Sequence, residues 1–248
     1  MSIDDIRVVL IDPQHPGNIG AAARAMKAMG LRRLYLVRPQ KFPAYEAERR
    51  ALGAVDVLEC AVVLEDAAEA VGDCRLVVGG SARARSFPLP VLDARESGRA
   101  LVREASAGQP VAALFGPERT GLSNEDLDRC TVQLRIPTSP DFSSLNLASA
   151  VQLLCYEVWM AACEGSDGAA PGPPRDRDYP TQREMEYFFE HLQRTLDARR
   201  FTFDNRRAAT LAKLRRLFGR ARPAVGELKL LHSLVRLMEG DDSTGPGA

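Results

Sequence analysis

The chain has 248 residues, of which 45% are hydrophobic and 27% are charged, a composition typical of a globular protein with its own core. This composition excludes disorder for most of the chain, and no apolar run reaches the roughly 18 residues that a membrane-spanning helix needs. The five cysteines are odd in number and form no C-x-x-C pair, which argues against a disulfide framework and a zinc knuckle. We therefore expect a cytoplasmic protein that binds no metal and does not enter a membrane.

The formal net charge is zero, but positive charge is concentrated toward the carboxyl end. Residues 199–222 contain nine cations and one anion, Asp204. An ordinary solvated helix surface is the alternative interpretation, but such a surface usually mixes both signs, so a surface that follows nucleic-acid phosphates explains the excess better. The predicted phosphate-binding residues are Arg199, Arg200, Arg206, Arg207, Lys213, Arg215, Arg216, Arg220 and Arg222.

Short apolar runs rich in β-branched residues recur through the first two-thirds of the chain and predict buried strands. They cover residues 7–11, 34–37, 55–64 in pieces, 76–78, 111–115 and 132–136. Apolar residues at helical spacing lie between them, at residues 19–29, 92–105 and 145–162. This alternation predicts an α/β fold with a mostly parallel sheet, in which ligands bind where strands end in loops.

A change in composition marks a domain boundary after this alternation. Residues 164–180 are rich in Gly and Pro and predict a linker that follows a first domain at residues 1–163. Apolar residues at helical spacing then predict three amphipathic helices within residues 181–239. We expect this basic helical extension to pack on another domain or chain, and residues 240–248 to be disordered.

The first of three candidate functional segments, residues 16–26, follows the first predicted strand and opens a helix. It is not a dinucleotide-binding fingerprint, because that motif needs three glycines and only Gly17 and Gly20 are present. Arg24 is costly to bury without a partner, so we expect it to reach solvent or to bind an anion. Asn18 either caps the helix or orients a hydroxyl group.

The second segment, residues 114–123, is a strand that runs into a tight turn. Gly116 permits a close backbone approach, and the proline after it fixes the turn. Glu118 and Arg119 are either an ordinary exposed pair or part of a site, and their position at the end of a buried strand favours a site.

The third segment, residues 136–148, runs from a strand into an apolar helix. Ser143 and Ser144 are plausible helix caps. Asn146 stands in the predicted first turn, where helices disfavour asparagine, so its amide is a candidate to face a cleft and hold a ligand.

Together the three segments, N-I-G-A-A-A-R-A-M, F-G-P-E-R-T-G-L-S and S-S-L-N-L-A-S-A-V-Q, resemble the motifs of the SpoU branch of the SPOUT methyltransferases. The stretch R-R-L-F-G-R-A-R-P at residues 215–223 and the closing helix resemble the TrmJ family of tRNA 2′-O-methyltransferases, which modify cytidine or uridine at position 32 in the anticodon loop. The resemblance implies a deep trefoil knot in the carboxyl half of the first domain and S-adenosylmethionine as methyl donor. It also implies a homodimer in which Arg24 faces the donor bound by the other subunit.

The resemblance assigns site residues one by one. It implies that Arg24, with Asn18, Glu118 and Asn146, acts on the ribose hydroxyl. Because a guanidinium is almost never deprotonated in proteins, we expect Arg24 to stabilise developing negative charge rather than to act as a base. Gly80 stands where the family often has threonine. The glycine lacks the threonine hydroxyl, so we expect only its backbone to contact the donor. The implied donor-binding residues are Gly80, Ser81, Ala82, Gly116, Ile136, Ser143, Ser144 and Leu145.

The expected function is therefore transfer of a methyl group to a ribose 2′-hydroxyl of tRNA, with no metal because the sulfonium supplies the electrophile. Two alternatives stay open. One is an enzyme of the same branch that acts on another RNA, such as a ribosomal loop or the tRNA D-loop, and the other is an RNA-binding protein without catalysis. The carboxyl-terminal extension favours methylation of tRNA by the TrmJ family over action on another RNA. A dinucleotide dehydrogenase is disfavoured, because the chain lacks its glycine pattern and its acidic ribose partner.

Overall fold

A computed structural model describes residues 3, 6–81, 89–142, 144–166, 178–199, 201 and 207–239. The chain forms two compact units, Met1–Pro171 and Gly172–Ala248, and the division between them falls inside the stretch predicted to be a linker. The residues at the centre of that stretch, 167–177, lie outside the described residues, as does the tail at 240–248.

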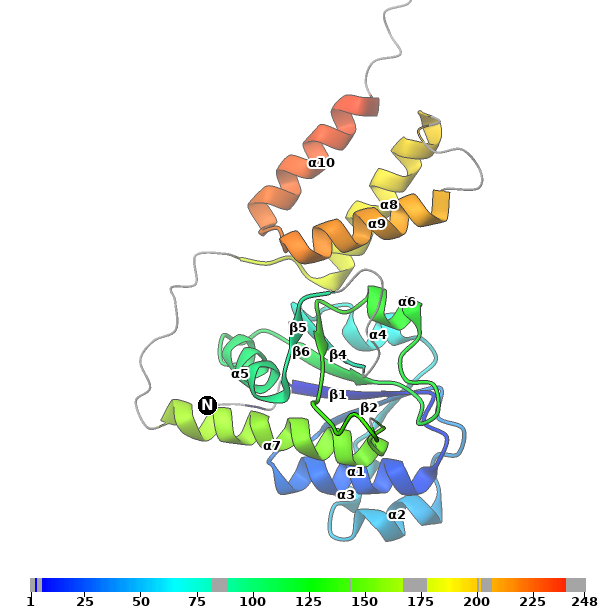
Figure 1. Cartoon of the computed structure of the whole chain (residues 1–248), viewed down its shortest axis with the longest axis vertical. Coiled ribbons are helices and arrows are strands. Elements are labelled where there is room, and N and C mark those ends of the chain that lie inside the picture. The colour runs from blue at the N-terminus through cyan, green and yellow to red at the C-terminus, as the bar shows by residue number, and fades with distance from the viewer. Residues whose placement is uncertain are drawn as a thin grey trace, which may run out of the picture. The chain divides into compact units, whose positions relative to one another are not determined.

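The first unit is built around a sheet in which all pairs of neighbouring strands are parallel (Figure 1). The described residues form seven strands in the order β3-β2-β1-β6-β4-β7-β5. Their bounds are β1 Ile6–Ile11, β2 Arg33–Val37, β3 Val62–Leu64, β4 Leu76–Gly80, β5 Val91–Leu92, β6 Val111–Phe115 and β7 Val132–Leu134.

Helices cover both faces of this sheet (Figure 1). Five of them pack with the core on one face: α1 Pro16–Ala28, α2 Tyr45–Ala51, α3 Val55–Glu59, α5 Ala94–Ala105 and α7 Leu147–Ser166. The other face carries α4 Ala67–Val71 and α6 Asn124–Asp128.

Strand β1 explains why the strands have continuous apolar sequences. Val8 and Leu10 belong to the core under the layer of α1 and α7, whereas Val9 and Ile11 belong to the core under α4 and α6. All four side chains are at most 1% exposed. Because both faces of the sheet are covered, each strand position favours an apolar residue. The predicted α/β class with a mostly parallel sheet is confirmed.

The prediction of strand structure from residue 55 onward is wrong at its start. Val55–Glu59 forms helix α3, and only Val62–Leu64 pairs as a strand. The side chains of Val57 and Leu58 are both buried, and a short apolar run of this kind does not distinguish a buried helical turn from a strand.

The two longer predicted helices also begin later than expected. Leu92 pairs with Leu134 as part of β5, and the helix after it starts at Ala94, where Asp93 and Glu96 form a capping box. The helix predicted from residue 145 starts at Leu147 and runs to Ser166.

The described residues of the second unit form three helices, α8 Gln182–Ala198, α9 Arg207–Ala221 and α10 Val225–Glu239. Thr181 and Glu184 form the capping box that begins α8. Phe188 is 1% exposed and packs edge-on against the rings of Phe218 and His232. This small apolar core holds the three helices together.

A polar cluster joins the carboxyl-terminal halves of α8 and α10. His191 Nδ1 lies 2.9 Å from His232 Nδ1, and His191 Nε2 lies 3.1 Å from a carboxylate oxygen of Glu239. Thr195 donates to the same oxygen at 2.6 Å. Burial, followed by the neighbouring His191 and Arg236, lowers the pKa of His232.

Candidate active site

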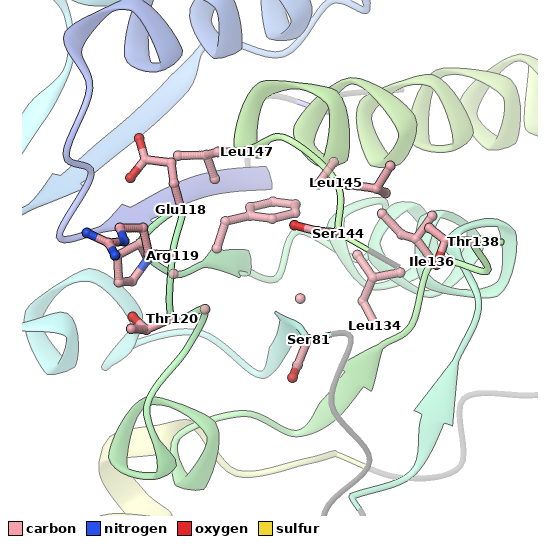
Figure 2. A pocket seen from close by; sticks show the side chains of 16 residues that line it. Ser81, Glu118, Arg119, Thr120, Leu134, Ile136, Thr138, Ser144, Leu145 and Leu147 are labelled. Atoms are coloured by element: carbon pink, nitrogen blue, oxygen red, sulfur yellow. The ribbon is translucent and has the colours of Figure 1, made fainter. Parts of the chain in front are cut away.

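A pocket of about 400 Å³ opens at the carboxyl ends of β4, β6 and β7, which are neighbours in the sheet (Figure 2). Leu134 and Ile136 form an apolar side, and Glu118 and Arg119 lie on the opposite side (Figure 2). The pocket is lined by Gly80, Ser81, Phe115, Gly116, Pro117, Glu118, Arg119, Thr120, Gly121, Leu134, Ile136, Thr138, Ser144, Leu145, Leu147 and Ala150.

The loop after β6 forms one wall of this pocket and depends on a glycine. A Cβ atom on Gly116 would lie 2.3 Å from both the carbonyl carbon of Gly121 and the backbone nitrogen of Leu122. The loop closes on itself through a hydrogen bond from the Gly121 N–H to the Pro117 carbonyl at 2.8 Å. Any side chain at Gly116 therefore forces this backbone to move.

The carboxylate of Glu118 anchors the start of α1. It accepts hydrogen bonds from the backbone N–H groups of Gln14 and His15, at 3.0 and 3.1 Å, and from the Asn18 amide at 2.8 Å. Helix α1 has no side-chain cap of its own. The Glu118 carboxylate, which comes from a distant loop, lies at the N-terminus of α1, where the helix dipole stabilises negative charge.

The ionisation of Glu118 reflects these contacts. Partial burial raises the pKa of a carboxylate, but the hydrogen bonds from Asn18 and from the backbone of Gln14, Glu118 itself and His15 outweigh burial, and the pKa of Glu118 is lowered. The side chain is therefore an anion that accepts hydrogen bonds at neutral pH.

A second hydrogen bond extends this arrangement to α7. The Asn146 amide donates to the side-chain oxygen of Asn18 at 3.0 Å, and the Asn146 side-chain oxygen accepts from the backbone N–H of Ala148 at 2.9 Å. Asn146 thus caps α7 rather than standing in its first turn, and Ser144 is not the cap. Asn18 does not cap α1. The three candidate segments are joined by the chain Glu118–Asn18–Asn146.

The structure brings most of the predicted donor-binding residues to the pocket. Gly80, Ser81, Gly116, Ile136, Ser144 and Leu145 line it, whereas Ala82 and Ser143 lie outside the described residues. Sequence reasoning did not assign nine further lining residues to donor binding, although it considered Arg119 part of a possible site. All but Ala150 lie at or next to the ends of predicted strands or in the candidate segments. The nine are Phe115, Pro117, Arg119, Thr120, Gly121, Leu134, Thr138, Leu147 and Ala150.

Arg24 is not among the residues that line this pocket. It is exposed on α1, where a second hollow of about 310 Å³ is lined by side chains of α1, α2 and α7 and by Leu52. Within the part of the chain that the structure describes, Arg24 makes no hydrogen bond or ion pair. The Arg24 guanidinium therefore lies outside the larger pocket of its own chain.

An apolar stripe runs along the outer face of α7. Leu153, Tyr156, Trp159 and Met160 are 38–46% exposed although they are large and apolar. Gln152, one helical turn before Tyr156 on the same face of α7, lines the hollow that contains Arg24. The exposed stripe and the Arg24 hollow are therefore adjoining features of the first unit.

The basic residues of the second unit differ in what they contact. Lys213 and Arg220 are exposed, whereas Arg215 forms a two-bond ion pair with Glu186 at 2.6 Å. Arg199 donates to the Met238 carbonyl, Arg222 lies over the Tyr179 ring and Arg216 is half-buried. Arg200, Arg206 and the side chain of Arg207 lie outside the described residues.

Among the residues that the structure describes, no three His, Cys, Asp or Glu side chains are grouped so as to hold a metal ion.

None of the described helices combines the length and the hydropathy that crossing a membrane requires.

Comparison with known proteins finds relatives of both parts of the chain. Residues 5–156 match the SpoU rRNA Methylase family, and residues 183–245 match the family "tRNA methyltransferase TrmJ, C-terminal domain". A tRNA (cytidine/uridine-2′-O-)-methyltransferase TrmJ of Escherichia coli is 44% identical, and the match covers 96% of each chain. The crystal structure of TrmJ from Z. mobilis ZM4 superposes with a TM-score of 0.80 at 32% identity, over 94% of this chain and 98% of that one.

A solved structure with a bound cofactor is also similar to about two-thirds of the chain. The SpoU methyltransferase AviRb from Streptomyces viridochromogenes, in complex with AdoMet, superposes with a TM-score of 0.53 at 25% identity, over 65% of this chain and 62% of that one.

The parallel sheet, the pocket at its strand ends and these matches define the class of the protein: it is a methyltransferase of the SpoU type. Since the likeness spans both units, the chain belongs to the TrmJ family of tRNA methyltransferases, and it is an enzyme.

Proposed function

We propose that the chain transfers a methyl group from S-adenosylmethionine to the ribose 2′-hydroxyl of cytidine or uridine at position 32 of tRNA, in the cytoplasm. The observation that carries this proposal is the Glu118–Asn18–Asn146 chain, which joins the three motif segments beside one pocket. The match to TrmJ proteins along 96% of the chain supports tRNA as the substrate.

The lining of the larger pocket fits the donor. Its volume of about 400 Å³ lies within the usual range for small-molecule sites. Leu134, Ile136 and Leu145 offer an apolar surface to a purine ring, and the backbone at Gly80 and Gly116 offers hydrogen-bonding groups without side chains in the way. When bound, the donor supplies a methyl group that is activated by the sulfonium.

Glu118, Asn18 and Asn146 are best assigned as positioning residues. The Glu118 carboxylate and both ends of the Asn18 amide already bind groups of this chain, so these side chains hold the segments in place. This assignment modifies the expectation that all three orient the ribose hydroxyl directly. They maintain the shape of the pocket beside which the ribose hydroxyl is aligned with the methyl group of the donor. Such alignment alone can contribute several kcal/mol to catalysis.

Arg24 serves the donor site of a partner subunit in this proposal. Its position outside the pocket of its own chain, beside an exposed apolar stripe on α7, supports a homodimer that buries the stripe. The guanidinium stays protonated and stabilises negative charge that develops on the 2′-oxygen as the methyl group is transferred.

We further assign a trefoil knot to the carboxyl half of the first unit. Strand β7 pairs on one side with β4 and on the other with β5, so it lies between two strands that precede it in sequence. The proposed knot has the chain thread past these strands after β7 and before α7. Such threading is a rare exception among folds.

The domain assignment follows the same proposal. Residues 1–163 carry methyl transfer, residues 164–180 link them to the helices at 181–239, and 240–248 form a tail. In the helical extension Lys213 and Arg220 are exposed cations without acidic neighbours in sequence, which suits contact with RNA phosphates.

Methylation followed by mapping tests the proposed function. Total tRNA lacking this modification is incubated with the protein and isotope-labelled S-adenosylmethionine, and nuclease fragments are sequenced by mass spectrometry. The proposal expects one labelled 2′-O-methyl group at nucleotide 32. Label in ribosomal RNA or the D-loop would support the same chemistry on another substrate and contradict position 32. Tight tRNA binding with no incorporation would indicate a binding protein and contradict catalysis.

A further inference from the structure

A cluster of three arginines, separate from the donor pocket, surrounds the hollow on α1 and α2. Arg24 comes from the middle of α1, and Arg49 and Arg50 come from the last turn of α2. The remaining lining residues are Ala21, Ala25, Ala28, Leu52 and Gln152, so no carboxylate lines the hollow. Three cations therefore share about 310 Å³ with no acidic side chain among them.

Close packing of the two helices brings these arginines together. A Cβ atom on Gly20 would lie only 2.0 Å from the Ala47 carbonyl oxygen, so α1 and α2 approach as closely as backbone permits. Small alanines of α1 form the adjoining wall of the hollow. The arrangement of Arg49 and Arg50 beside Arg24 is thus set by the fold and not by flexible loops.

The three arginines form no ion pair within the described residues, although Glu46 lies one turn before Arg50 on α2. They make no hydrogen bond there either, and all three are exposed. Lys27, on the same helix as Arg24, instead pairs with Asp56 at 2.7 Å, and Arg38 pairs with Asp12 at 2.9 Å. Like charges repel one another, so an anion bound in the hollow relieves a repulsion that the chain itself leaves in place.

We propose that Arg49 and Arg50 bind backbone phosphates of the RNA substrate next to the methylated ribose and so hold that ribose at Arg24. The inference rests on the proposed function. A ribose 2′-hydroxyl is adjacent to the 3′-phosphate of its own nucleotide, so a residue that acts on this oxygen has phosphates close by. The planar fork of arginine binds the oxygens of a phosphate in pairs, and the proposed RNA substrate supplies phosphates beside the reacting ribose.

The test compares a double variant, Arg49→Ala with Arg50→Ala, with the wild-type enzyme. Binding of a fluorescent anticodon stem-loop is measured at several salt concentrations, and methylation kinetics are measured with full tRNA. Each lost phosphate contact should reduce the log–log salt slope by about one, so the double variant should lose about two. KM for tRNA should rise at least about tenfold, while kcat and the affinity for S-adenosylhomocysteine are retained.

Two control variants sharpen this test. Arg99→Ala removes an exposed arginine that already pairs with Glu164 at 3.1 Å, and it should change neither the salt slope nor KM. The double variant with lysine at both positions keeps the charge and should recover most of the salt slope.

The outcomes separate this inference from the proposed function. If the wild-type enzyme methylates tRNA but the alanine double variant keeps its salt slope and KM, the phosphate assignment is wrong and the proposed function stands. If the double variant instead dissociates into monomers by light scattering with an unchanged salt slope, the cluster serves subunit contact and the assignment is again wrong. A wild-type enzyme that fails to methylate any tRNA contradicts the proposed function itself.

Discussion

The side-chain amide of Asn18 donates a hydrogen bond of 2.8 Å to the carboxylate of Glu118, and this contact joins the start of α1 to the loop after β6 across 100 positions of sequence. Through Asn146 the same arrangement reaches the cap of α7. Pocket shape, helix orientation and the ionisation of Glu118 therefore depend on one another.

Replacing Glu118 by alanine should damage both folding and catalysis. The N–H groups of Gln14 and His15 and the Asn18 amide lose their acceptor, and an unsatisfied, partly buried donor costs about 1–3 kcal/mol. Displacement of the adjoining segments should lower kcat by about 10²-fold. Urea unfolding and single-turnover methylation measure the two effects. An unfolding free energy and a kcat both equal to wild type would show that these hydrogen bonds position nothing.

Substituting Gly116 by valine should strongly weaken donor binding while the protein stays folded. The new side chain would meet the backbone of Gly121 and Leu122 at 2.3 Å, so the loop that lines the pocket must move. Calorimetry with S-adenosylhomocysteine should show an affinity at least about tenfold weaker. Gly226→Ala is a matched control, because a Cβ atom there meets nothing within 4 Å. Wild-type affinity in the Gly116→Val protein would place the donor elsewhere.

The exposed cations of α9 should contribute to tRNA affinity independently of fold stability. Lys213→Ala and Arg220→Ala should each reduce the salt slope by about one without shifting the melting temperature. If about five cations of residues 199–222 reach phosphates, these contacts should contribute about −3 to −4 to the wild-type slope.

Arg215→Ala provides the contrast within the same helix. This side chain pairs with Glu186 and lies 4.5 Å from the centre of the Phe189 ring, so its loss should lower the stability of the second unit. Salt titrations and thermal melts of the Lys213→Ala, Arg220→Ala and Arg215→Ala proteins distinguish phosphate contact from a role in stability. A flat salt response of the wild-type protein would contradict any phosphate contact by these helices.

The second unit should become less stable as pH falls below neutrality. The pKa of His232 is lower in the folded protein than its ordinary value of 6.5, so the unfolded chain binds the proton first. The stability is therefore fully present above about pH 6.5 and is lost as pH falls through the folded pKa. Hydrogen-exchange protection of α8 and α10 in the full chain should decline between pH 7 and 5.5. His232→Phe keeps an aromatic ring there, and its protection should vary less with pH across this range.

The strands and the loops that follow them could be predicted from the sequence because burial and close approach restrict the residue types. Strands such as Ile6–Ile11 are buried on both faces, which leaves a continuous apolar run, and segments rich in glycine after those strands mark loops that approach a ligand. Strand β5 escaped prediction because its two residues are defined by pairing with β7. The short helices α2, α4 and α6 have five to seven residues and too few turns to show a period.

The sequence predicted which residues lie in the site better than it predicted which of them contact one another. Asn146 and Asn18 are 128 positions apart, and no local pattern indicates that their amides meet. Arg49 and Arg50 follow each other in a stretch with mixed charge, and only the close approach of Gly20 to Ala47 shows that they share a hollow with Arg24.

A mixed-subunit experiment tests the proposed shared active site of a homodimer most directly. Arg24→Ala chains keep an intact donor pocket, and Gly116→Val chains keep Arg24, so each homodimer should be inactive. When the two chains are co-expressed with different tags and the heterodimer is isolated, one complete site forms from parts of both, and about half of the wild-type methylation rate should return. A heterodimer as inactive as its parents would show that each chain acts on its own donor.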